Sequence, residues 1–501
     1  GMARNRPIWL GRNVAVSPLA LENIERMVPN SIGCVLERVN LSDTGLINIF
    51  PALRIHGDCE IESFRLTESE EAHVAAVLAQ KKPFCVGRVK DMDLKEYAVG
   101  VITKMSLKDC EIKHLSLAAS EEAHVAAVLA QKKPFCVGRV KIMRLWDYAV
   151  GVITKMSLKD CEFEWLWLTA SEEAHVAEVL AQEKPFCVGR VEMMWLREYA
   201  VGVITKMSLK DCEIKYLSLA ASEEAHVAEV LKQEKPFCAG RVKDMHLWDY
   251  AVGVITKMSL KDCEIERLCL TAREEAHVAA VLKQEKPFCA WRVKDMVLRE
   301  YAVGVITKMS LKDCEFELLY LSASKKTHVA EVLKQEKPFC VGRVKRMDIW
   351  DYAVGVITKM SLEDCEFEYL SLSADKEAHV AEVLAQEKPF CVGRVKDMHL
   401  WGYAASVITK MTIHEDNTME RFVLAGHGDH FSRILEEGDN SIDLGRIRTG
   451  GLRVPEEIKR KLRYTLVDGE GEEVLEEEND EEEITTSDGE TSWFDDEEER
   501  S

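Results

Sequence analysis

CEIKHLSLAASEEAHVAAVLAQKKPFCVGRVKIMRLWDYAVGVITKMSLKD, residues 110–160, is the stretch that decides the fold, because the chain repeats it. Seven near-identical units of 51 residues cover residues 58–411, and each carries a histidine at the same place. Self-similarity at such a period is typical of solenoids, in which every unit buries its apolar face against its neighbours. The marker histidines are His73, His124, His175, His226, His277, His328 and His379.

Each unit contains two segments with the two-residue period of a strand and one segment with a helical pattern. IKHLSL at 112–117 and VKIMRL at 140–145 alternate apolar and polar residues near their ends, which predicts strands. Between them, Ser120 is expected to cap a helix that Pro134 ends. The segment YAVGVITKMSLKD, residues 148–160, is β-branched and contains glycine, so we do not expect it to be α-helical.

A second register also fits the unit. Ile102, Met105, Leu107, Cys110 and Ile112 spell L-x-x-L-x-L-x-x-C-x-I. If ITKMSL (102–107) is a paired strand, each unit has three strands and a helix. The sequence leaves this open.

The L-x-x-L-x-L pattern, present twice per unit with a helix in one connection, resembles the leucine-rich-repeat superfamily. The spacings of 28 residues from Ile112 to Val140 and 23 from Val140 to Phe163 are similar to the paired repeats of ribonuclease-inhibitor-like and immune-receptor-type members. The resemblance covers about residues 30–450. It implies an α/β repeat solenoid: a horseshoe with a parallel strand face and helices or loops on the outer side. The family's usual asparagine after the strand is Tyr97 or Ser120 here, so its asparagine ladder is absent. Another α/β repeat architecture, or a closed seven-bladed ring, is the alternative.

The rest of the chain divides around these units. Residues 1–57 are expected to hold an N-terminal cap and a diverged repeat, 412–464 a degenerate closing repeat, and 465–501 a disordered acidic tail. The tail has 18 Asp and Glu against one Arg, so it carries -17 of the formal charge of -21. The near-neutral body lacks the clustered positive charge that a nucleic-acid groove needs, so no nucleic-acid partner is expected.

Cysteine usage and hydropathy predict a cytoplasmic protein. Of 16 cysteines, seven lie in KPFC and seven in DCE contexts, one per repeat, which predicts small buried core residues rather than disulfides. No apolar run at the start reads as a signal peptide, and no stretch is long enough to span a membrane, so no membrane partner is expected.

The units differ mainly at strand positions that are expected to point away from the core. On the first strand of each unit, one series is Ser63, His114, Trp165, Tyr216, Arg267, Leu318 and Tyr369. The next is Arg65, Ser116, Trp167, Ser218, Cys269, Tyr320 and Ser371. The second strand gives Asp93, Arg144, Trp195, His246, Val297, Asp348 and His399, and beside it Lys95, Trp146, Arg197, Trp248, Arg299, Trp350 and Trp401.

These four series are expected to form adjacent columns on one sheet face. Seven of the ten tryptophans fall in them, and Trp, Tyr and Arg are the residues that carry interface hot spots. We therefore expect a non-enzymatic protein that binds a macromolecule, above all a protein, with immune-type recognition as one use. The expected anchors are Trp146, Trp165, Trp167, Trp195, Tyr216, Trp248, Tyr320, Trp350, Tyr369 and Trp401. Arg144, Arg267, His246 and His399 are expected to add polar specificity.

Two other interpretations stay open. The variation is also compatible with drift at exposed sites, or with packing against another part of the chain. A structural scaffold, in which the repeats set spacing and the acidic tail recruits a basic partner, is a function of a different class. The sequence does not indicate the oligomeric state.

Catalytic and metal chemistry is not expected. Each marker histidine lacks a second His or Cys three or four residues away, so the sequence predicts no metal site there. No phosphate-binding loop or nucleophile elbow occurs, and seven equal sites are not how a catalytic constellation is built. No cofactor is expected.

Overall fold

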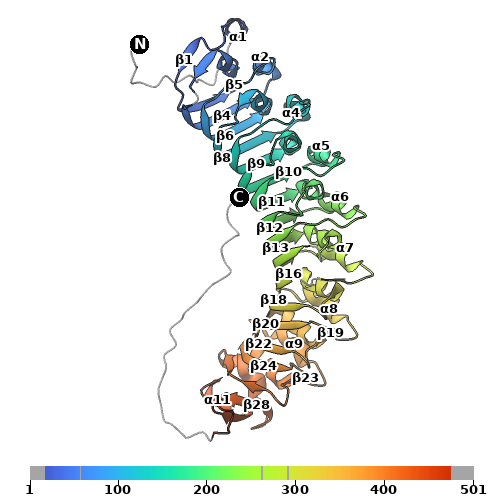
Figure 1. Ribbon diagram of the computed structural model, residues 1–501. Coiled ribbons are helices and arrows are strands. Elements are labelled where there is room, and N and C mark those ends of the chain that lie inside the picture. The colour runs from blue at the N-terminus through green and yellow to red at the C-terminus, as the bar shows by residue number, and fades with distance from the viewer. Residues whose placement is uncertain (1–16, 57, 261–262, 290–292, 475–501) are drawn as a thin grey trace.

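Seventeen strands form one parallel sheet that runs the length of the folded chain (Figure 1). The computed structural model describes residues 17–56, 58–260, 263–289 and 293–474. Each strand pairs with its neighbours in chain order, and β2 and β29 form the two ends. The strands are β2 (Arg38–Ser42), β4 (Glu60–Glu68), β6 (Arg88–Glu96), β8 (Glu111–Ala119), β9 (Arg139–Asp147), β10 (Glu162–Ala170), β11 (Arg190–Glu198), β12 (Glu213–Ala221), β13 (Arg241–Asp249), β14 (Glu264–Ala272), β16 (Val293–Glu300), β18 (Glu315–Ala323), β20 (Arg343–Asp351), β22 (Glu366–Ala374), β24 (Arg394–Gly402), β27 (Arg421–Ala425) and β29 (Leu452–Arg453).

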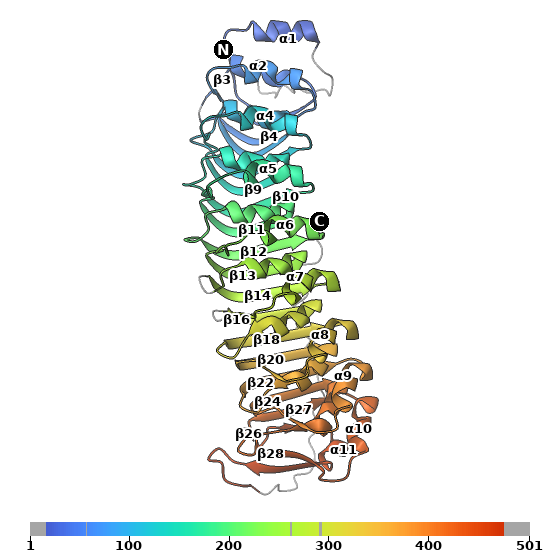
Figure 2. The ribbon, with the colours of Figure 1, turned by 90° about the vertical axis from the view of Figure 1, so that its right-hand side faces the viewer.

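One face of this sheet is the core. In β8, Ile112, Leu115, Leu117 and Ala119 are buried, as the apolar positions of L-x-x-L-x-L predict. Helical segments cover this face, whereas the opposite face is the inner side of a gently curved stack (Figures 1 and 2). The predicted α/β repeat solenoid with a parallel strand face is confirmed.

Short helical segments make up the other side of the solenoid. They are α1 (Pro18–Glu25), η1 (Leu46–Ala52), η2 (Glu71–His73), α2 (Ala75–Leu78), α3 (Ala98–Val101), η3 (Ile102–Lys104), α4 (Glu122–Leu129), η4 (Tyr148–Lys155), η5 (Glu173–Val176), α5 (Ala177–Leu180), η6 (Tyr199–Lys206), η7 (Glu224–Val227), α6 (Ala228–Leu231), η8 (Tyr250–Lys257), η9 (Glu275–Val278), α7 (Ala279–Leu282), η10 (Tyr301–Lys308), η11 (Lys326–Val329), α8 (Ala330–Leu333), η12 (Tyr352–Lys359), α9 (Glu377–Leu384), η13 (Tyr403–Lys410), η14 (Gly428–Phe431), α10 (Ser432–Leu435) and α11 (Glu456–Lys459).

The expected helix cap is wrong by one residue. α4 begins at Glu122 and its N-cap is Glu121, whose backbone N–H donates to Nδ1 of His124 at 3.1 Å. Ser120 instead donates its backbone N–H and its hydroxyl to Oε2 of Glu96, at the end of β6. The serine therefore joins the helix to the preceding strand, a contact 24 residues away that local spacing does not reveal.

The YAVGVITK segment is not an α-helix over its length, as expected. In most units it is one 3₁₀ helix such as η4, and its Ala149, Val150, Val152 and Ile153 are buried against the sheet. In the first unit, α3 forms one α turn before η3.

The question of ITKMSL is also answered. Ile102–Lys104 ends the helical segment, and only Met105–Ser106 (β7) is a strand. It pairs with Phe84–Cys85 (β5) within the same unit rather than with the main sheet. The other short strands are β1 (Ile32–Cys34), β3 (Leu53–Ile55), β15 (Phe288–Cys289), β17 (Met309–Ser310), β19 (Phe339–Cys340), β21 (Met360–Ser361), β23 (Phe390–Cys391), β25 (Met411–Thr412), β26 (Thr418–Met419), β28 (Ile442–Arg448) and β30 (Leu462–Val467).

A glycine makes the turn into the second strand of the unit. Gly138 has φ +74°, and a Cβ there would lie 2.5 Å from the carbonyl oxygen of Leu107 and 2.6 Å from that of Cys110. A side chain at Gly138 would strain the backbone and force the neighbouring carbonyl groups to shift. Gly151, inside η4, has no positive φ, and a Cβ added there would lie 3.4 Å from its nearest neighbour, the Cβ of Glu178.

The marker histidines join one unit to the next. His175 is 5% exposed, and its Nδ1 lies 3.1 Å from Oδ1 of Asp147, the last residue of β9. The ring of Tyr148 packs edge-on against it with centroids 4.5 Å apart. His175 is thus a polar residue near the start of a helical segment that packs on the neighbouring repeat.

The cysteines behave in two ways. The DCE series is largely buried, and its thiols donate to backbone carbonyls, as Cys110 does to Gly87 at 3.2 Å. In the KPFC series, Cys136, Cys187 and Cys340 are exposed, so the expectation of a buried thiol is wrong there. All cysteines whose state is described are free thiols.

The folded chain extends past residue 465, where the sequence predicts the tail to begin. β30 ends at Val467, and Val474 still donates its backbone N–H to Leu466. Most of the predicted tail, residues 475–501, lies outside the described residues. Among the described helices, none is long and apolar enough to cross a lipid bilayer.

Candidate binding surface

The strand pairing brings the four diversified series together on the inner face of the sheet. Trp167 on β10 lies opposite Arg144 on β9 and Trp195 on β11, so the second and third series alternate in one column. The expectation of four columns is therefore wrong: the register makes three. The same register pattern continues along the whole sheet, as with His246 opposite Ser218 and Cys269.

Seven of the predicted residues form a continuous ring cluster across β9–β13, the central cluster. Trp195 is at its centre, with ring centroids 5.0 Å from Trp167, 5.8 Å from Trp165 and 5.9 Å from Tyr216. Tyr216 in turn lies 4.8 Å from His246. Trp146 extends the cluster at one end, 6.0 Å from Trp167, and Trp248 at the other, 6.3 Å from His246.

Five further residues form two smaller ring clusters on β18–β24, one of Tyr320 and Trp350 and one of Tyr369, His399 and Trp401. Tyr320 lies 6.4 Å from Trp350, and His399 lies 4.8 Å from Tyr369 and 6.3 Å from Trp401. Trp350 and Trp401 are 43% and 45% exposed, which is unusual for the largest apolar side chain.

Small residues on alternate strands make room for the large rings. Trp146 lies between Ala118 and Thr169 in the register, and Trp248 lies between Ala220 and Thr271. Because neighbouring strands are only about 4.8 Å apart, large side chains on every strand of this column would crowd one another. This column therefore alternates a small residue with one from the Lys95, Trp146, Arg197 series.

Two arginines beside the central cluster, Arg144 and Arg197, stack on its tryptophan rings. The Arg144 guanidinium lies 5.6 Å from the Trp167 ring centroid, and that of Arg197 lies 5.0 Å from Trp167 and 5.6 Å from Trp195. Within the part of the chain that the structure describes, no carboxylate lies within ion-pairing distance of either. Cation–π stacking of this kind holds a guanidinium in place and leaves its charge available.

Two other arginines on this face, Arg267 and Arg346, form ion pairs within the sheet. Arg267 lies 3.2 Å from Asp295 and 3.9 Å from Asp244, and Arg346 lies 2.7 Å from Asp348. The predicted specificity residue Arg267 is therefore ion-paired with carboxylates of neighbouring strands, whereas Arg144 contacts only an aromatic ring there among the described residues.

The packed face perturbs several titratable groups. Burial, aided by the nearby charges of Arg299 and Arg267, lowers the pKa of His246 to about 4. Burial raises the pKa of the Cys269 thiol to about 12, and it also lowers the pKa of His399. At neutral pH both histidines are thus uncharged aromatic members of their clusters.

The structure adds a series that the sequence prediction left out. The register places a varied residue of the second strand between members of the Ser63, His114, Trp165 series, for example Met193 between Trp165 and Tyr216. The series is Asp91, Ile142, Met193, Asp244, Asp295, Arg346 and Asp397. The sequence does show variation at this position, with four residue types in seven units, although it varies less than three of the four predicted series.

One polar atom in the central cluster has no internal partner. The indole Nε1 of Trp195 is buried and makes no hydrogen bond within the described residues, whereas Nε1 of Trp167 donates to the Thr169 hydroxyl at 2.9 Å. A buried unpaired donor is rare in native proteins.

Comparison with known proteins gives no relative. No protein family matches the sequence, no curated protein matches it, and no solved structure matches the fold.

Proposed function

We propose that the chain is a non-enzymatic binding protein that recognises a protein ligand through the inner face of its sheet, in the manner of a leucine-rich-repeat receptor or inhibitor. The observation that carries the proposal is the central cluster. Varied Trp, Tyr, His and Arg residues from five successive strands lie side by side there, on a face that no other described element covers.

The size and composition of the face support a macromolecular ligand. Five strands span about 19 Å across the sheet at a spacing of about 4.8 Å. Interfaces draw most of their affinity from a few aromatic and arginine residues at the centre of such a patch. Arg144 and Arg197, which no carboxylate of the described residues neutralises, favour a ligand with acidic side chains beside an apolar contact. A carbonyl or carboxylate of the ligand would satisfy Nε1 of Trp195.

The repeats provide a test that leaves the scaffold intact. Trp165→Ser, Trp167→Ser and Trp195→Asp each introduce the residue type found at the equivalent position of another unit. These equivalent residues are Ser63, Ser116 and Asp93. The triple variant should fail to bind a protein ligand that the unaltered chain binds. A matched control carries Ala130→Lys and Lys132→Glu, two residue types that other units have at the equivalent exposed positions of the helical side. This control variant should still bind the ligand. Equal ligand binding by the unaltered chain, the triple variant and the control variant would overturn the proposal.

The scaffold remains a second candidate function because of the charge of the C-terminal segment, -17 over residues 465–501. A basic partner would then bind that segment. Deletion of residues 475–501 should abolish such binding, whereas the tryptophan variant should leave it unchanged. The two functions thus predict opposite outcomes for the same two variants.

A further inference from the structure

The junction between the N-terminal diverged repeat and the first 51-residue unit differs from the junctions between the units that follow. Later junctions repeat one arrangement: a strand-end carboxylate such as Asp147 contacts the marker histidine, and the next residue, Tyr148, packs on its ring. In the first junction the equivalent residues are Asp43 and Thr44, so the tyrosine is missing. The marker histidine there is His73.

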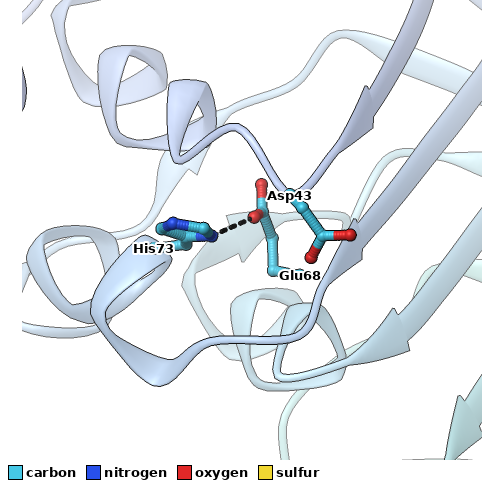
Figure 3. Close-up of side chains that lie close together, drawn as sticks. All are labelled: Asp43, Glu68 and His73. Carbon is cyan, nitrogen blue, oxygen red and sulfur yellow. Dashed lines mark hydrogen bonds and ion pairs between the residues drawn. The ribbon is translucent and has the colours of Figure 1, made fainter. Parts of the chain in front are cut away.

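An extra carboxylate occupies this junction. Glu68 stands at the end of β4, where the equivalent strands of the later units all end in alanine: Ala119, Ala170, Ala221, Ala272, Ala323 and Ala374. Its Oε2 lies 3.0 Å from Nδ1 of His73. Figure 3 shows the Glu68 carboxylate between the His73 ring and Asp43.

The Glu68 carboxylate is buried and only half satisfied. The residue is 0% exposed, and Oε1 has no hydrogen-bond partner among the described residues. Burial raises the pKa of Glu68, which the His73 charge opposes in part. Leaving a buried carboxylate oxygen unpaired is costly, and native proteins compensate for it with a proton, a water molecule or a cation.

We propose that Asp43, Glu68 and His73 bind a divalent metal ion of the class that prefers oxygen and nitrogen donors, such as Mn²⁺. Each residue offers one ligand atom, and the three atoms lie within 4.8 Å of one another. Ligand atoms about 2.1 Å from a common metal lie roughly 3.0–3.4 Å apart, so the 3.0 Å between Glu68 and His73 fits such a site. Two carboxylates and one imidazole suit Mn²⁺ better than they suit the softer thiophilic ions.

Surrounding groups hold the three ligands in place. Ser69 donates its backbone N–H and its hydroxyl to Oδ1 of Asp43, at 2.7 and 2.6 Å. The Asn48 side chain donates to the carbonyl oxygen of His73 at 2.8 Å. Such outer contacts orient ligands and are part of metal sites generally. The site escapes a search by spacing because its ligands come from the ends of two strands and the start of a helix.

Electron paramagnetic resonance of Mn²⁺ tests the proposal on the full chain. Free Mn²⁺ gives a sharp signal that is lost on binding, so a titration measures affinity and stoichiometry. Glu68→Ala, which introduces the letter of the sister units, should weaken the strongest site at least about tenfold. Asp43→Asn should do the same, whereas the matched change Asp147→Asn at a later junction should have no effect. Weak binding by the acidic C-terminal segment should persist in every variant.

A second readout locates the ion. Substoichiometric Mn²⁺ should broaden the imidazole resonances of His73 before those of the other marker histidines, and thermal unfolding without metal should show that Glu68→Ala is folded. Identical Mn²⁺ titrations of the unaltered chain and Glu68→Ala would overturn the proposal. In that case the Glu68–His73 contact is an internal hydrogen bond only.

Discussion

Trp167 and Trp195 lie directly opposite each other on β10 and β11, with ring centroids 5.0 Å apart and ring planes inclined by 37°. They come from different series of the repeat, one from the first strand of a unit and one from the second. Their contact exists only because the parallel register aligns the two strands. The proposed binding surface thus depends on the pairing of strands from different units and is not contained in any single unit.

This pair should be energetically coupled. Such aromatic pairs contribute about 0.5–1.5 kcal/mol beyond the area they bury. A double-mutant cycle with Trp167→Ser and Trp195→Asp should show a coupling of that size. Amide hydrogen exchange in β10 and β11 is the measurement, because a solenoid does not unfold as one unit. Strictly additive effects would mean that the rings do not touch in solution.

His246 should titrate far below a free histidine. Burial and two arginines lower its pKa to about 4 from the ordinary 6.5. The unfolded chain binds this proton near pH 6.5 and the folded chain only near pH 4, so stability falls as the pH drops through that window. The loss is at most about 3 kcal/mol. NMR titration, with the resonance assigned by His246→Phe, measures the pKa directly; a value near 6.5 would show that the cluster is open to water.

Substitution by alanine should destabilise the protein to different extents at two glycines of the same unit. Gly138→Ala places a Cβ against two carbonyl oxygens at positive φ, so it should cost at least about 1–2 kcal/mol. Gly151→Ala meets only ordinary contacts and should change stability by less than about 1 kcal/mol. Thermal unfolding and hydrogen exchange of β8 and β9 compare the two variants. Equal effects would argue against the turn described here.

Thiol labelling should follow exposure. Burial raises the pKa of Cys161 and Cys365 to about 11, so at pH 8 each has about 100-fold less thiolate than an ordinary thiol. Cys136, Cys187 and Cys340 are exposed and should react first with iodoacetamide, as mass spectrometry of the folded protein would show. Rapid labelling of Cys161 in the folded chain would contradict the burial of the DCE series.

Much of the fold can be predicted from the sequence because the same residue pattern recurs in seven units. The period, the buried positions such as Leu115 and Leu117, and the strand face all come from letters that recur at fixed places. What escaped prediction depends on contacts between units. Ser120 bonds to a strand end 24 residues earlier, so local spacing assigned it the wrong role.

The candidate site was predicted in the same uneven way. Variation between copies picked out Trp165, Trp167 and Trp195, and the structure brings their rings together. The number of columns and the part played by Met193 depend on which strand pairs with which, and no single unit contains that information. Pairing of Arg267 with Asp295 likewise joins two strands and was not foreseen.

Site-specific photo-crosslinking is the most direct test of the central claim that the strand face recognises a protein. A benzoylphenylalanine at position 350, where Trp350 is 43% exposed, and one at position 132 on the helical side would sample the two faces. We expect one protein to be crosslinked from position 350 and not from position 132. The triple variant Trp165→Ser, Trp167→Ser and Trp195→Asp should abolish the crosslinked product. Crosslinking of the partner from position 132 alone would contradict it.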